Sequence, residues 1–363
     1  MTFSYSTQCC GLIYGNQPHH LDHLATLCAC FDIPLILTDQ ELEQQAKHYY
    51  PQLVIFYFSS LEAPQKILQN YDIILTTMPY DLFDSCFFLA KKLINKSPMT
   101  IWCPHGNSDK GHSIFFMEAL KKENAVFVYG EKMLDFLKEK NALQANCSIT
   151  AIGNYRYEFY QTHQGFYNKL TKQEILSKFT KNQSTYLYAP TWNDYEKTSS
   201  FHLACPHLLE TLPDNINLIV KLHPNTLLAE DMHVKKLIWK YESAPNIVFL
   251  EHFPLIYPLL DVVDLYIGDT SSIGYDFLTF NKPLFFLNIQ NPIPNHYLYQ
   301  CGNILQKEDF PAIYSKIKEY LLTDQLLFSK KRKETYTYTF SKHEPFDKIL
   351  LQLCHLYKHH HAQ

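Results

Sequence analysis

Two histidines and one hydroxyl-rich turn are the residues of this sequence whose types and spacing could carry out chemistry. His105 is followed by Gly106, His223 is followed by Pro224, and residues 270–272 read Thr-Ser-Ser. An imidazole titrates near neutral pH, so it is the commonest general base for deprotonating a hydroxyl. Backbone N–H groups at the start of a helix attract phosphate, and hydroxyl donors add to that attraction. The simpler interpretation of His105 is a loop residue that caps the next helix. The simpler interpretation of residues 270–272 is likewise a Ser or Thr that caps a helix.

Four polar segments each follow a short apolar run, and these runs are predicted strands. Because the carboxyl ends of parallel strands share one edge of a sheet, we expect the segments at ligand-binding edges. Lys221 and His223 lie on one side of their strand by alternation, so a cation and an imidazole could meet a diphosphate there. A solvated lysine and a histidine bonded to a backbone carbonyl fit equally well. With the last residues of their strands, the segments are 102–112, 188–194, 219–225 and 268–276.

The elements that must position these segments alternate between strand-like and helix-like patterns. This alternation predicts an α/β protein with parallel sheets covered by helices on both faces. Predicted strands are 10–14, 35–37, 54–58, 73–76, 100–103 and 125–129, then 186–188, 216–220, 247–250, 265–267 and 284–287. Predicted helices include 19–31, 81–94, 131–140, 169–180, 229–241, 312–322 and 345–357.

Composition limits the classes of protein that remain. The chain has 363 residues, of which 46% are hydrophobic and 19% charged, so it is globular and long enough for two domains. A net charge of −4 gives no support to nucleic-acid binding. Ten cysteines without a C-x-x-C pair indicate neither a structural zinc site nor a redox motif. No signal peptide and no membrane-spanning run is apparent, which predicts a cytoplasmic protein.

The order of the motifs resembles the CDP-glycerol glycerophosphotransferase family of teichoic-acid primases and polymerases. His-Gly, Ala-Pro-Thr-Trp, Lys-Leu-His-Pro, Asp-Thr-Ser-Ser-Ile and Asn-Lys-Pro follow one another between His105 and Phe286. Gly153-Asn-Tyr-Arg156 is similar to the family's Gly-x-Pro-Arg junction between domains. The resemblance covers about half of the chain and is most specific in its second half.

This resemblance implies a GT-B-like fold with two doubly wound Rossmann-type domains facing a central cleft. Residues 1–155 would form an acceptor-side domain and 156–340 a nucleotide-donor domain, with 341–363 as a helix packing back on the first. The implied reaction moves glycerol phosphate from a CDP-linked donor to a polyol, sugar or lipid-linked hydroxyl and releases CMP. It belongs to cell envelope biosynthesis, so peripheral contact with the inner face of the membrane is a further expectation.

The family's functional residues carry over onto matching positions of this chain, and no metal or cofactor is implied. His105 and His223 would be catalytic, with His105 as the base. Asp269 would meet a ribose or glycerol hydroxyl, while Asp276 is expected to be structural. The residues implied in donor binding are Gly106, Arg156, Thr191, Trp192, Lys221, Asp269, Thr270, Ser271 and Ser272.

Departures from the family's motifs leave two other functions open. Asn107-Ser108 replaces Thr-Pro, Asn193 replaces an Arg, and Thr270 replaces a Tyr. One alternative is a GT-B glycosyltransferase or epimerase that uses a UDP-sugar. The Ser271-Ser272 pair argues against the epimerases, which usually carry Gly-Gly there. The other alternative is a non-catalytic nucleotide-binding protein on the same scaffold.

Overall fold

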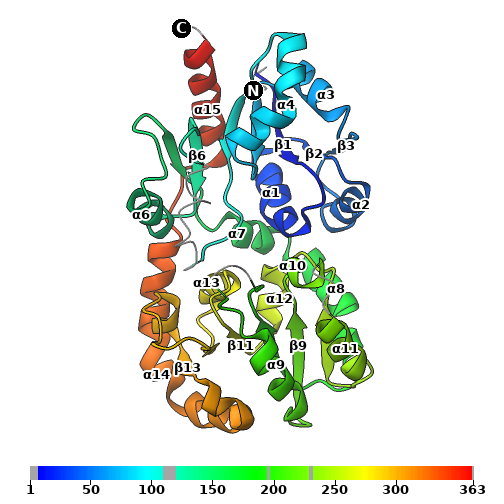
Figure 1. The fold of residues 1–363 in the computed structure, drawn as a ribbon, viewed down its shortest axis with the longest axis vertical. Helices are drawn as coiled ribbons and strands as arrows, with labels where there is room; N and C mark the ends of the chain where they lie inside the picture. Colours follow the sequence, from blue (N-terminus) through cyan, green and yellow to red (C-terminus); the bar gives the residue numbers. More distant parts are fainter. Residues whose placement is uncertain (1–6, 109–119, 194–196, 229–231, 362–363) are drawn as a thin grey trace. The chain divides into compact units, whose positions relative to one another are not determined.

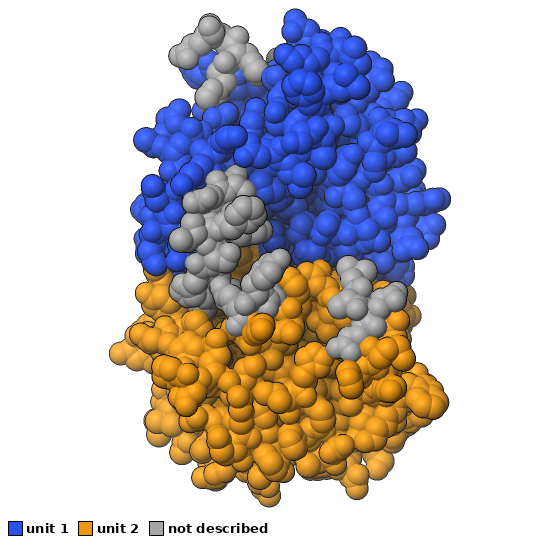
Figure 2. Space-filling model, viewed as in Figure 1, with its two compact units in different colours: residues 1–105, 111–159, 339–363 blue, residues 106–110, 160–338 orange. Residues whose placement is uncertain are grey.

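The computed structural model describes residues 7–108, 120–193, 197–228 and 232–361. Its chain divides into two compact units, coloured separately in Figure 2. Both units are built from more than one stretch of the chain, as the ribbon in Figure 1 allows the reader to follow. Unit 1 comprises 1–105, 111–159 and 339–363, and unit 2 comprises 106–110 and 160–338.

Unit 1 contains a seven-stranded, all-parallel sheet in the order β3-β2-β1-β4-β5-β6-β7. Its central strands are fully buried, which explains why they read as unbroken apolar runs. The chain order reverses direction between β1 and β4, where doubly wound sheets bind ligands. The strands are β1 (Cys9–Ile13), β2 (Leu35–Leu37), β3 (Ile55–Tyr57), β4 (Ile73–Thr76), β5 (Met99–Trp102), β6 (Ala125–Val128) and β7 (Ser148–Ala151).

The helices of unit 1 begin and end at residues that suit those positions. Pro18 opens the first helix, where its missing N–H costs nothing, and Asp32 closes it in the left-handed conformation. The Asp39 carboxylate caps the second helix by accepting the Leu42 N–H at 2.8 Å. The helices are α1 (Pro18–Phe31), α2 (Gln40–Tyr49), α3 (Ala63–Asn70), α4 (Tyr80–Ile94), α6 (Glu131–Glu139), α7 (Tyr155–Thr162) and α15 (Phe346–His361).

The C-terminal helix α15 belongs to unit 1 and packs on α1 and β4. The Phe346 ring meets the Phe31 ring edge-on at 4.9 Å, and the Tyr357 hydroxyl donates to Asp72 at 3.4 Å. The segment before α15 approaches β6 closely, because the Ser341 N–H donates to the Tyr129 carbonyl at 3.1 Å. Unit 1 is therefore completed by residues from the far end of the chain.

Unit 2 contains a six-stranded, all-parallel sheet in the order β10-β9-β8-β11-β12-β13. Numbered within the unit, this is the 3-2-1-4-5-6 order of a Rossmann fold, with its reversal between β8 and β11. The strands are β8 (Ser184–Ala189), β9 (Ile216–Lys221), β10 (Ile247–Leu250), β11 (Leu265–Gly268), β12 (Leu284–Leu287) and β13 (Asn303–Leu305). The helices are α8 (Gln164–Glu174), α9 (Phe201–Glu210), α10 (Pro224–Leu228), α11 (Met232–Tyr241), α12 (Tyr257–Val262), α13 (Ile273–Phe277) and α14 (Ile313–Thr339).

The predicted α/β class is confirmed, and most predicted strands lie within a residue or two of the observed ones. Two strands at sheet edges, β7 and β13, were not predicted. The helix predicted over 312–322 is the first part of α14, which continues to Thr339. The first three residues of the helix predicted over 229–241 lie outside the described residues.

Candidate functional site

The reversal point of the unit 2 sheet brings two of the predicted polar segments together. Ala189, the last residue of β8, is in register with Gly268, the last residue of β11. The chain leaves these strands as Pro190-Thr191 and as Asp269-Thr270, so both segments start side by side at the carboxyl edge. Ligands bind at this edge in doubly wound sheets. Sequence alone placed both segments at strand ends, and the register makes them neighbours.

Asp269 holds these neighbouring segments in place. Its carboxylate is fully buried and accepts the Thr191 N–H at 2.8 Å and the Ser200 N–H and hydroxyl, both at 2.9 Å. A buried carboxylate needs such donors, because an unpaired charge away from water is costly. Contact between Asp269 and a hydroxyl of the donor stays a prediction. Within unit 2 its carboxylate is surrounded by backbone and hydroxyl donors.

A second hydroxyl-rich segment, 198–200, lies against the Thr270–Ser272 turn. The Thr198 and Thr270 hydroxyl oxygens are 2.9 Å apart, and Ser199 donates to the Thr191 carbonyl at 2.7 Å. The Tyr188 and Ser200 hydroxyls are also 2.9 Å apart. Sequence reasoning missed this segment, although its Thr-Ser-Ser letters repeat those of 270–272.

The residues after His105 also join this group. Within unit 2, the Ser108 hydroxyl donates to the Thr270 carbonyl at 3.3 Å. Gly106 has φ +144°, and a Cβ atom there would lie 3.0 Å from the Ser272 Oγ. Only glycine fits such a close approach without strain. The predicted His-Gly and Thr-Ser-Ser motifs are therefore brought together at Gly106 and Ser272.

His223 lies just beyond β9 with a defined hydrogen-bonding role. Its Nδ1 accepts the Asn225 N–H at 3.1 Å, so the neutral ring carries its proton on Nε2 and can donate from there. The Trp192 ring is inclined 30° to the imidazole, with ring centres 6.1 Å apart. The Lys221 ammonium donates to the Phe253 carbonyl at 2.6 Å. These three predicted site residues thus all lie at the carboxyl edge of the unit 2 sheet.

His105 lies in unit 1 among other histidines. Its ring centre is 4.3 Å from that of His20 and 6.0 Å from that of His19. Burial, with His19 nearby, lowers the pKa of His105 to about 4, so the ring is neutral at pH 7. Its Nδ1 is buried and has no hydrogen-bond partner among the described residues. Sequence reasoning singled out His105 but missed His19 and His20, whose adjacency at a helix start was visible.

Arg156 is buried in unit 1, where its guanidinium donates to the Asp22 carboxylate at 3.0 Å. The Tyr50 hydroxyl donates to the other Asp22 oxygen at 3.1 Å. Donor binding by Arg156, which the motif resemblance implies, stays a prediction. Within unit 1 its charge has a carboxylate partner from α1.

Two other motif residues have structural roles in unit 2. Asp276 is buried and accepts the Tyr257 hydroxyl at 3.2 Å, as expected of a structural carboxylate. Lys282 of the Asn-Lys-Pro motif donates to the Asp261 and Val263 carbonyls at 2.7 and 2.9 Å. Because helix carbonyls at a C-terminus lack intrahelical donors, Lys282 closes the end of α12.

Neither a metal site nor a membrane span emerges from the described part of the chain. Among residues 7–108, 120–193, 197–228 and 232–361, no cluster of three or more His, Cys, Asp or Glu is arranged to hold a metal ion. No helix within these ranges is long and apolar enough to cross a membrane.

Two all-parallel Rossmann-type sheets with flanking helices define a GT-B-like protein, and the solved structures agree. The wall teichoic acid polymerase TagF superimposes over 98% of this chain and 90% of its own, with a TM-score of 0.67 and 12% identity. Staphylococcus aureus MnaA, solved with UDP, covers 96% of both chains with a TM-score of 0.64 and 12% identity. At these identities the likeness concerns the fold, and the predicted fold class is confirmed.

Sequence comparison then supports a family resemblance. The model of the CDP-glycerol:poly(glycerophosphate) glycerophosphotransferases matches residues 140–293. The teichoic acid glycerol-phosphate primase of Bacillus subtilis is 24% identical over an alignment of 260 positions, which covers 64% of this chain and 66% of that protein. The chain thus spans just under two thirds of that relative. These comparisons support the resemblance to the CDP-glycerol glycerophosphotransferase family that the motifs predicted.

Proposed function

We propose that this chain transfers glycerol phosphate from a CDP-linked donor to a hydroxyl acceptor in teichoic-acid synthesis. The acceptor oxygen forms a new bond to the phosphorus that carries glycerol, while the bond from that phosphorus to the bridging oxygen breaks and CMP leaves. Such transfers depend mainly on positioning and on stabilising charge. The observation that carries the proposal is the hydroxyl-rich turn 270–272, held at the reversal point of a family-matched Rossmann sheet.

In unit 2, the donor phosphates would be bound by hydroxyl, amide and imidazole donors. The turn contributes the hydroxyls of Thr270, Ser271 and Ser272, and the Gly106 backbone lies beside it. These groups already lie together, because the Ser108 hydroxyl donates to the Thr270 carbonyl and Gly106 lies against Ser272. His223 donates from Nε2, because its Nδ1 is engaged by the Asn225 amide. Thr191, Trp192 and Lys221 complete the donor-binding set.

Three further side chains have distinct roles in this proposal. His105 is the base that takes the proton of the acceptor hydroxyl, which its neutral ring can do. Asp269 and Arg156 act as positioning residues, because their charges are engaged by Thr191 and Asp22 respectively. The same proposal assigns unit 1 to the acceptor and unit 2 to the donor, with residues 341–363 serving unit 1. It also places the protein in the cytoplasm, in peripheral contact with the membrane.

The test measures CMP release from CDP-glycerol by the full chain, with a glycerol phosphate-primed acceptor. We expect His105→Ala and His223→Ala to lower turnover by about 10²-fold or more while the circular dichroism spectrum stays unchanged. His355→Ala on α15 and His233→Ala on α11 are matched controls, because both side chains are exposed. Absence of CMP release from every CDP-linked alcohol tested would contradict the proposal.

A UDP-sugar donor is the second candidate, because MnaA and the Anabaena protein HepE share the fold and their structures contain UDP or UDP-glucose. TagF has also been solved after soaking with CDPG. A thermal-shift panel of CDP-, UDP- and GDP-linked ligands separates the two donors. Stabilisation by UDP-sugars alone would favour the second candidate. Binding without turnover of any donor would favour a non-catalytic relative.

A further inference from the structure

Four histidines of unit 1 gather at the carboxyl edge of its sheet. His19 and His20 lie in the first turn of α1, His23 follows one turn later, and His105 comes after β5. The His19 and His20 ring centres are 4.1 Å apart, and His20 lies 4.3 Å from His105. The His20 Nδ1 is 2.9 Å from the hydroxyl of Thr77, the residue after β4. This cluster therefore lies at the reversal point of the unit 1 sheet.

Hydrogen bonds hold the cluster in a fixed arrangement. The Tyr129 hydroxyl donates its one proton to the Pro104 carbonyl at 3.1 Å, so it must accept from the His23 Nδ1 at 2.7 Å. His23 therefore carries a proton on Nδ1, and Tyr129 ties α1 to the backbone just before His105. The imidazoles thus come from two separate parts of the chain, namely α1 and the segment that follows β5.

The surroundings of the cluster favour an anion. The first turn of α1 contains no acidic residue, and the Gln17 side chain does not cap it. His19 and His20 therefore lie at the positive end of the helix dipole, with no carboxylate in the same turn. The Asp22 charge, one turn away, is neutralised by Arg156 at 3.0 Å.

The His105 Nδ1 provides a second and independent indication of a ligand. It is buried and lacks a hydrogen-bond partner among the described residues. Leaving a polar atom buried without a partner costs free energy, so a bound oxygen that pairs with it would be favourable. A bound oxygen that accepts a hydrogen bond from Nδ1 would also leave the His105 Nε2 available to act as a base.

We propose that His19, His20, His105 and the start of α1 form a second phosphate site, which binds the terminal phosphate of a glycerol phosphate-ended acceptor. Phosphate binding here is independent of the proposed function, and only its assignment to the acceptor rests on that function. The site gives the acceptor its own anchor in unit 1, separate from the hydroxyl-rich turn of unit 2.

Occupation of this site would activate the base. Burial lowers the pKa of His19 and of His105 to about 4, and the pKa of His23 is lowered well below its usual value by burial and Arg156. A bound phosphate favours the protonated imidazole and so raises these pKa values toward neutrality. A base with a pKa nearer the working pH removes a hydroxyl proton more effectively. His105 thus becomes an effective base only when the acceptor is present.

The test measures binding of glycerol 3-phosphate and of sulfate to the full chain by calorimetry, without donor. Sulfate does not titrate between pH 5 and 9, so any pH dependence of its binding comes from the protein. We expect binding to weaken about tenfold between pH 6 and pH 8, with proton uptake from the buffer. The double variant His19→Gln/His20→Gln should weaken binding about tenfold or more, while His355→Gln should not.

Two further readouts keep the outcome clear. CDP binding by the double variant should equal that of the wild type, which shows that the chain is folded and that unit 2 is intact. The imidazole nitrogen resonances of the cluster should shift when sulfate is added. Absent binding, equal binding by the double variant, or pH-independent sulfate binding would each overturn the phosphate site. Turnover without histidine-dependent phosphate binding defeats only this inference, whereas phosphate binding without CMP release defeats only the proposed function.

Discussion

Gly106 and Ser272 approach each other so closely that a Cβ atom at position 106 would crowd the Ser272 side chain. A Cβ atom there would lie 3.0 Å from the Ser272 Oγ and 3.1 Å from its Cβ. The residues are far apart in sequence, and each follows a different strand. Their approach joins the residue after His105 to the hydroxyl-rich turn of unit 2.

We expect Gly106→Ala to destabilise unit 2 by about 1–3 kcal/mol, because a φ of +144° strains any residue with a Cβ atom. Adding Ser272→Gly should recover only part of the loss, since it removes the contact and leaves the backbone strain. Urea unfolding measures both variants. Gly165→Ala is the matched control, because nothing lies within 4 Å of its Cβ position. Equal stability of Gly106→Ala and Gly165→Ala would contradict this interpretation.

Asp269→Asn should destabilise unit 2 by about 2–4 kcal/mol. Both carboxylate oxygens accept backbone N–H groups, from Thr191 and Ser200, and an amide would turn its own NH₂ toward one of them. Urea unfolding gives the change in free energy. The exposed Asp214→Asn serves as control and should change stability little. A loss for Asp269→Asn no larger than that of the control would show that the carboxylate is not a structural anchor.

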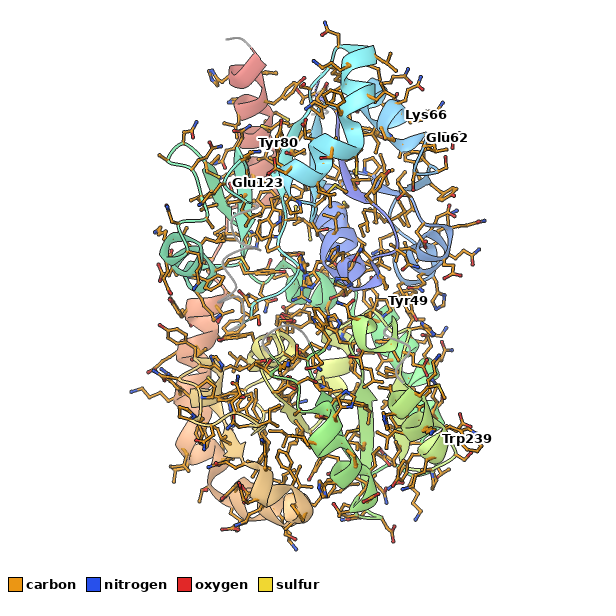
Figure 3. All side chains as sticks on the ribbon, viewed as in Figure 1. Tyr49, Glu62, Lys66, Tyr80, Glu123 and Trp239 are labelled. Carbon is orange, nitrogen blue, oxygen red and sulfur yellow. The ribbon has the colours of Figure 1, made fainter. Side chains whose placement is uncertain are left out.

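Glu123 makes the stability of unit 1 depend on pH. One carboxyl oxygen of Glu123 accepts the Tyr80 N–H at 2.6 Å, and both residues are labelled in Figure 3. The other carboxyl oxygen has no hydrogen-bond partner among the described residues. Burial raises the pKa of Glu123 from 4.5 to about 8. The folded state therefore resists ionisation. The resulting penalty is absent below pH 4.5, grows toward pH 8, and is complete above it.

Glu123→Gln keeps an oxygen for the Tyr80 N–H and cannot ionise. We expect it to be more stable than the wild type at pH 9 by about 1–3 kcal/mol, and nearly equal at pH 5. Thermal unfolding at the two pH values gives the comparison, with the exposed Glu139→Gln as control. A gain that is the same at both pH values would mean that ionisation of Glu123 is not its cause.

The His343–Glu158 pair should act in the opposite direction. The His343 Nε2 lies 3.1 Å from the Glu158 carboxylate, and this hydrogen bond raises the pKa of His343 above 6.5. A raised histidine pKa stabilises the fold below 6.5, and this contribution is lost as the pH rises through the folded value. Glu158→Gln should therefore cost up to about 1 kcal/mol at pH 5.5 and little at pH 8.5, since Glu158 is largely exposed. Unfolding curves that show an equal cost at both pH values would rule this out.

The fold was accessible from sequence where a strand is buried on both faces. The predicted strand 73–76 coincides with β4, whose four residues are all buried. By contrast, β7 and β13 lie at sheet edges and are half-buried, so their residues do not form an apolar run. The pattern of α14 is blurred beyond Leu322, because Leu322 and Leu326 are exposed while Arg332 is fully buried against Asp324.

The site was accessible only as far as local motifs reach. Strand ends and motif order selected His105, His223 and the turn 270–272 as candidate site residues, and their roles stay predictions. The hydrogen-bond partners of Asp269 and Arg156 could not be predicted from local sequence. Thr191 is 78 residues from Asp269, and Asp22 is 134 residues from Arg156. A charged side chain in a motif suggests a ligand until its own counter-charge in the fold is known.

The division of unit 1 into stretches from both ends of the chain sets an order for folding during synthesis. The seven strands of its sheet leave the ribosome early, whereas α15, which packs on α1 and β4, emerges only after all of unit 2 has been made. Until then, the surfaces around Phe31 and Asp72 lack the helix that covers them. Unit 2 can therefore complete its sheet first. At that stage the nascent chain contains a folded unit 2 and a unit 1 that still lacks α15.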